Sequence, residues 1–86
     1  MNMLEAAKET VGLAETRGMD DKESLIPELS FEHLVSMMER MKSTAISPAK
    51  MGRWLGWMQC AVVAAGCGTL EEMKAINMRH SQDTDK

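Results

Sequence analysis

Few side chains in this 86-residue sequence could carry out chemistry, and they are scattered. Cys60 and Cys67 could act as nucleophiles or metal ligands, and His33 and His80 could act as bases or ligands. Metal sites usually bring ligands together at spacings such as Cys-x-x-Cys or His-x-x-x-His, and neither spacing occurs here. A nucleophilic cysteine needs a base beside it, and nothing in the sequence places a histidine next to Cys60. We therefore expect no metal site, no cofactor and no enzymatic activity.

Two other motifs have structural explanations. The segment 66–68, Gly-Cys-Gly, lacks the lysine and the strand–loop–helix context of a phosphate-binding loop. Glu71 and Glu72 are adjacent acids, but the helix dipole favours acids in the first turn of any helix. No secretory signal is visible, so we expect a cytoplasmic protein with reduced thiols at Cys60 and Cys67.

The clearest charge feature is a basic run beside the tryptophans. Four bases and no acid occur between residues 40 and 53, although the whole chain has a net charge of −3. The bases are Arg40, Lys42, Lys50 and Arg53. Ordinary solvated helix ends would explain this run. An acidic protein surface could also bind it, and nucleic acid is a further alternative that the acidic net charge disfavours.

Trp54 and Trp57 follow the basic run. On a helix, Trp54 lies on the main apolar face and Trp57 lies near its edge. We favour a Trp57 that is covered by another helix, whereas an uncovered Trp57 would be an aromatic anchor of the kind that dominates protein interfaces. The residues that we expect to contact a partner are Lys50, Arg53, Trp57 and Gln59.

These residues all belong to one predicted central helix, over 48–66, on which we expect the other elements to pack. Ser47 is a good N-cap, and Pro48 suits the first helical position because its missing N–H costs nothing there. Gly66 is a natural stop, since glycine accepts the left-handed conformation that ends many helices. Apolar residues recur at helical spacing at Met51, Trp54, Leu55, Met58, Ala61, Val62 and Ala65.

Small residues form a second stripe on the same helix. They are Gly52, Gly56, Cys60 and Ala64. A stripe of small residues lets another helix approach closely. We expect a tight helix–helix contact inside the domain, with a groove for a partner helix or a homodimer contact as the alternatives.

The remaining sequence predicts an all-α fold. A helix over about 31–43, capped by Ser30, should form an antiparallel hairpin with the central helix. The capping box Thr69-x-x-Glu72 opens a short C-terminal helix that ends near Arg79. The chain is divided into an amphipathic, loosely packed N-terminal helix (1–18), a linker (19–29), a helical core domain (30–80) and a disordered tail (81–86). The apolar run 54–68 is shorter than the roughly 20 residues that cross a bilayer, so we expect no membrane span.

One stretch resembles a known family. Its residues are Lys50, Arg53, Trp54, Leu55, Gly56, Trp57 and Gln59, then Gly66, 69–74 and Asn77. They are similar to an R-W-L-G-aromatic-x-Q C-terminal module of small early-region proteins of tailed bacteriophages and prophages. The resemblance implies a phage accessory protein that acts in the bacterial cytoplasm and there binds and modulates a host protein, such as a nuclease or defence factor. The alternatives are a small nucleic-acid-binding adapter that uses the basic hairpin tip, and a homo-oligomeric structural protein.

Overall fold

Each helix of the protein begins at a residue whose side chain caps it. In the computed structural model, which describes residues 1–81, the helices are α1 (Met3–Thr16), α2 (Phe31–Ser43), α3 (Pro48–Ala64) and α4 (Leu70–Arg79). Their N-caps are Asn2, Ser30, Ser47 and Thr69, and each accepts a hydrogen bond from a backbone N–H of the first turn. Such caps satisfy N–H groups that have no partner inside the helix.

Two helices are followed by a glycine in the left-handed region. Gly18 has φ +84° after α1, and Gly66 has φ +75° after α3. A side chain is strained at such a φ, so these two positions favour glycine. Helix α3 ends at Ala64, two residues before the expected end, because the amides of Gly66 and Cys67 already bond to Val63 and Val62 in the closing turn.

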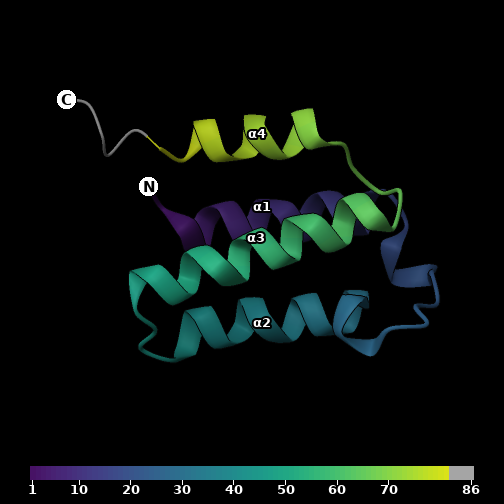
Figure 1. Cartoon of the computed structure of the whole chain (residues 1–86), viewed down its shortest axis with the longest axis horizontal. Coiled ribbons are helices and arrows are strands. Elements are labelled where there is room, and N and C mark those ends of the chain that lie inside the picture. The colour runs from purple at the N-terminus through teal and green to yellow at the C-terminus, as the bar shows by residue number, and fades with distance from the viewer. Residues whose placement is uncertain (82–86) are drawn as a thin grey trace.

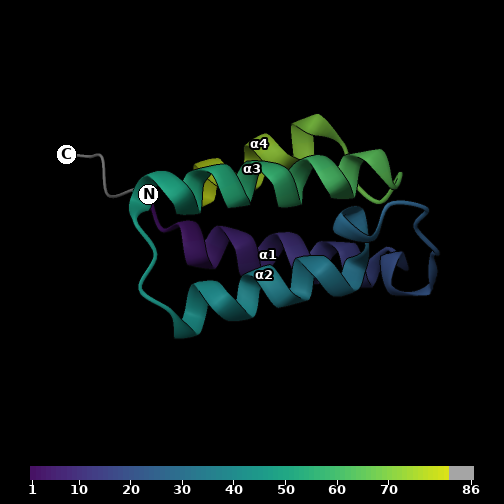
Figure 2. The ribbon, with the colours of Figure 1, turned by 60° about the horizontal axis from the view of Figure 1, so that its bottom comes forward.

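Helix α1 lies at the centre of the fold. Figures 1 and 2 show α1 behind α3 and beside α2, with α4 along the other edge of the molecule. Successive helices run in opposite directions, and α1 packs against each of the other three. Helices α2 and α3 are antiparallel, as expected, but each packs mainly against α1 and only slightly against the other. The prediction that 48–66 is the central element is therefore wrong.

The N-terminal helix is not loosely packed, contrary to the expectation from its sequence. Its buried residues are Ala6, Ala7, Thr10, Val11 and Ala14. Most of them are small, so they give α1 a weak hydrophobic pattern while allowing the neighbouring helices to approach closely. They belong to the same core cluster as Leu34 of α2, Met58 of α3 and Ile76 of α4. One continuous core thus includes α1.

The linker between α1 and α2 crosses the end of the helices as two short 3-10 turns, Met19–Asp21 and Pro27–Leu29. Met19 is buried in the core, whereas Leu25 is fully exposed. Residues 1–81 contain no strand, as an all-α fold requires. None of the helices described is long and apolar enough to span a membrane. The expected disordered tail lies outside the described residues, apart from Ser81.

Candidate functional site

The outward side of α3 is the part of the molecule that carries the predicted site residues. We call it the outer face, defined by the exposed residues Lys50, Gly52, Arg53, Gly56, Trp57, Cys60, Val63 and Ala64. Figure 1 shows α3 at the front of the bundle, between α4 and α2, so that this side is turned away from α1. Past Arg53 the face carries no charged side chain for about three turns.

Trp57 is exposed rather than covered. Its side chain keeps 45% of its accessible surface. The indole Nε1–H donates a hydrogen bond of 2.9 Å to the backbone oxygen of Glu28 in the linker. This bond satisfies the only polar group of the ring and holds the ring against the linker. Trp57 therefore presents an oriented apolar surface, and our preference for a covered side chain is corrected.

The bases predicted for the site lie around the start of α3. Arg40 and Lys50 both place their charges 5.4 Å from the centre of the Trp54 ring. Cation–π attraction of this kind favours their positions by roughly 0.5–1 kcal/mol at an exposed site. Arg53 is exposed and has no ion pair or hydrogen bond from its side chain within residues 1–81. Its guanidinium is free to bind a partner.

Gln59 lies in the interior, not on the outer face. Its side chain is 8% exposed, and its amide nitrogen donates to Asn77 Oδ1 at 2.8 Å and to Thr10 Oγ1 at 3.3 Å. Its oxygen accepts a bond of 3.2 Å from Asn77 Nδ2. The side chain thus joins α1, α3 and α4, so Gln59 is a structural residue and the prediction of a surface contact is withdrawn.

The small-residue stripe has no helix packed on it. Gly52, Gly56, Cys60 and Ala64 are all exposed. A Cβ atom added at Gly56 would meet nothing within 4 Å, and one at Gly52 would make only an ordinary 3.7 Å contact with Met3. The expected tight internal contact is therefore wrong, and neither glycine is required by packing inside the described part of the chain.

A groove adjoins the outer face at the C-terminal end of α3. It has a volume of about 470 Å³ and lies between the linker and the last turns of the helix. Its apolar walls include Ile26, Leu29, Phe31, Ala61 and Ala64. The sequence pattern did not indicate this groove, because the groove forms only where the linker folds back beside α3. Ile26 is 51% exposed.

No family model, curated protein or solved structure matches this chain.

The reactive side chains are far from forming a constellation. Cys67 is buried and Cys60 is exposed. Neither histidine is paired with a cysteine. His80 Nε2 lies 2.9 Å from Glu9 Oε1, and His33 lies on α2. No group of three metal-ligating side chains occurs among residues 1–81.

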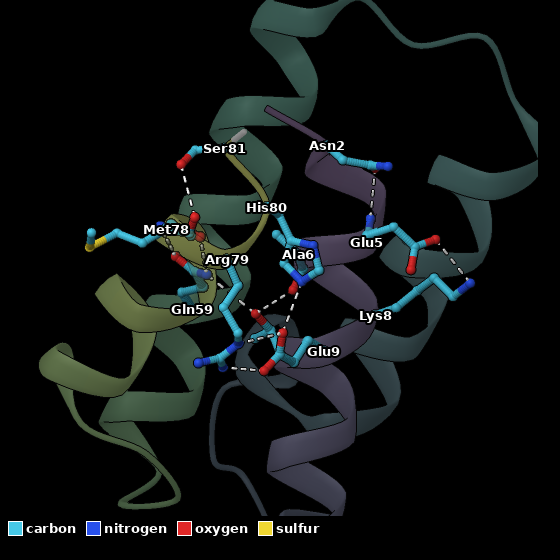
Figure 3. Close-up of polar contacts among 12 residues, drawn as sticks. Asn2, Glu5, Ala6, Lys8, Glu9, Gln59, Met78, Arg79, His80 and Ser81 are labelled. Atoms are coloured by element: carbon cyan, nitrogen blue, oxygen red, sulfur yellow. Dashed lines mark hydrogen bonds and ion pairs between the residues drawn. The ribbon is translucent and has the colours of Figure 1, made fainter. Parts of the chain in front are cut away.

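Two surface ion pairs fix α4 to α1 and lie apart from the outer face. Glu9 pairs with Arg79 and also contacts His80, as Figure 3 shows. Hydrogen bonds from Arg79 lower the pKa of Glu9 below its ordinary value of 4.5. At the opposite end, Arg17 lowers the pKa of Glu72 in the same way through a 2.5 Å bond. These pairs add to the attachment that α4 gains from its buried Met73 and Ile76. They have a structural role and need no ligand.

Proposed function

We propose that this chain is a non-enzymatic binding module that recognises another protein through the outer face of α3. The observation that carries the proposal is the exposed, oriented Trp57. Its ring is held by the linker, its N–H is satisfied, and the neighbouring Arg53 is unpaired within residues 1–81. Aromatic side chains and arginines of this kind supply most of the binding energy at protein interfaces.

The resemblance of 50–59 and 66–77 to phage early-region proteins supports a more specific proposal. On that basis the partner is a bacterial host protein, the protein acts in the cytoplasm, and binding modulates a nuclease or defence factor. The basic residues Lys50 and Arg53 favour an acidic surface on that partner, because opposite charges speed encounter and set orientation.

An affinity pull-down from bacterial lysate, treated with nuclease and analysed by mass spectrometry, tests the proposal. The wild type should retain a stoichiometric host protein, and Trp57→Ala and Arg53→Ala should each lose most of it. Met78→Ala is the matched control, since Met78 is exposed on α4, away from the outer face. Equal capture by all four folded proteins would refute a role for the outer face.

The second candidate function is nucleic-acid binding by the basic hairpin tip. It is favoured by one observation, the clustering of Arg40 and Lys50 on the Trp54 ring. Phosphate contacts would make the affinity fall steeply with salt. If the captured material disappears on nuclease treatment and purified DNA or RNA binds with a steep salt dependence, this function replaces the first.

A further inference from the structure

Several large apolar side chains on one side of the molecule are exposed, and we call this set the apolar strip. Its members are Trp57 and Val63 on α3 and Leu25 and Ile26 in the linker. Val63 is 37% exposed, and the other three are exposed by larger fractions. Single exposed apolar residues are ordinary, but two of these four, Leu25 and Ile26, also line the groove, and exposed apolar side chains around a groove are typical of an interaction surface.

The strip has opposite charges at its two ends. The turn from α2 to α3 and the linker lie at opposite ends of the long axis of the molecule, which measures 42 Å (Figure 1). Around the turn, residues 40–53 carry four bases, including Lys50 and Arg53, and no acid. The linker carries four acids and one base over residues 20–28, and Glu23 and Glu28 are exposed beside the groove and Trp57.

From this charge pattern we infer that the outer face binds a second copy of the chain, with the two α3 helices antiparallel and related by a two-fold axis near Trp57. Residues 50 and 64 lie equally far from position 57, each about 10 Å along the helix. The axis therefore places Lys50 of one copy opposite Ala64 of the other. The basic end of each copy then meets the acidic linker of its partner.

Self-complementarity is what distinguishes a second copy from an arbitrary partner. A two-fold interface uses the same patch on both subunits, so the patch must offer both members of each contact. Here the bases and the acids lie at the two ends of one strip. The aliphatic stems of Lys50 and Arg53 can lie over the apolar groove of the other copy while their charges reach Glu23 and Glu28. The small residues at Gly56 and Cys60 let the helices approach closely.

This inference rests on the proposed function, because it assigns an occupant to the same protein-binding face. Self-association and binding of a host protein then compete for the outer face. The contact is one helix and a short linker, which is small beside a standard interface of about 800 Å² per partner, so we expect a weak dimer that forms only at high protein concentration.

Sedimentation equilibrium on the purified protein, from about 10 µM to about 1 mM, measures the self-association directly. An acidic variant, Lys50→Glu with Arg53→Glu, and a basic variant, Glu23→Lys with Glu28→Lys, reverse the charge at one end each. In antiparallel pairing each variant opposes like charges, so each alone should dimerise at least about tenfold more weakly than wild type at low salt. An equimolar mixture should recover wild-type affinity as a heterodimer.

A control variant, Lys8→Glu with Lys74→Glu, makes the same change of net charge as the acidic variant but away from the outer face. It should dimerise as wild type does. Circular dichroism verifies that every variant folds. The inference is overturned if wild type stays monomeric to about 1 mM, if the charge variants associate as strongly as wild type, or if their mixture remains monomeric. Any of these results leaves the proposed function standing, because the pull-down tests that function separately.

Discussion

Replacing Gln59 by alanine tests the interior network that joins three helices. The substitution removes the two hydrogen bonds that the amide donates and the one that it accepts. Each net hydrogen bond contributes about 1 kcal/mol. Thr10 keeps its 2.8 Å bond to the oxygen of Ala6, and the half-buried Asn77 can hydrogen-bond to water instead. The substitution therefore leaves no buried polar group without a partner, and the loss of stability is that of the hydrogen bonds alone. We expect the free energy of unfolding to fall by about 2–3 kcal/mol.

Urea unfolding, followed by circular dichroism at low micromolar concentration, is the assay. Working in dilute solution keeps any self-association from adding to the measured stability. A loss of 2–3 kcal/mol corresponds to a melting temperature lower by roughly 10–20 °C in a domain of this size. The matched control is Cys60→Ala, on the exposed side of the same helix turn. It should change the stability by no more than about 0.5 kcal/mol.

A double-mutant cycle locates the effect. Gln59→Ala combined with Asn77→Ala should show a coupling of about 1 kcal/mol, since the two side chains share two hydrogen bonds. If Gln59→Ala costs less than about 0.5 kcal/mol, the side chain is solvated in solution. The assignment of Gln59 as an interior residue would then be refuted, and its surface role would become tenable again.

Three further measurements test other parts of the structure. Gly56→Ala should raise the free energy of unfolding by about 1 kcal/mol, because the added methyl group meets nothing within 4 Å. Gly66→Ala should lower the free energy of unfolding by about 1 kcal/mol, because Gly66 has φ +75°. Equal effects of the two substitutions would contradict the left-handed conformation of Gly66. Leu34→Ala should cost about 2–5 kcal/mol by leaving a cavity in the core, and urea unfolding will show it. The pKa values of Glu9 and Glu72 are lowered in the folded protein, so their ion pairs stabilise the fold at any pH above the unfolded-state pKa near 4.5. This stabilisation is lost as the pH falls through the lower pKa values of the folded state. Melting temperatures measured from pH 7 to pH 3 should therefore fall less for Glu9→Gln than for wild type.

The helices could be predicted from the sequence because their ends are marked by local chemistry. Ser30, Ser47 and Thr69 cap α2, α3 and α4, and Gly66 adopts the left-handed conformation expected of it. Caps and stops act within one turn, so they can be identified without knowing the tertiary structure.

The packing could not be predicted in the same way. The buried positions of α1 are mostly alanines, together with Thr10 and Val11. These residues give a weak apolar signal, so the helix that forms the centre of the bundle was expected to be loose. Gln59 was expected to contact a partner because it follows the basic run and the two tryptophans in the sequence. Its burial depends on Thr10 and Asn77, which are 49 and 18 residues away in the sequence. Periodicity contains no information about such distant hydrogen bonds.

The two glycines of α3 make the strongest case that its outer face was shaped by something outside the chain. A glycine inside a helix costs about 1 kcal/mol relative to alanine. Alanine would fit at both Gly52 and Gly56 without a close contact. Stability of the monomer therefore favours alanine at both, and nothing in the described structure offsets the cost. A second chain packed closely on this face would offset it. Gly56→Ala should thus stabilise the monomer and weaken the dimer in the same protein, whereas a stabilised monomer with unchanged association would exclude close approach at Gly56.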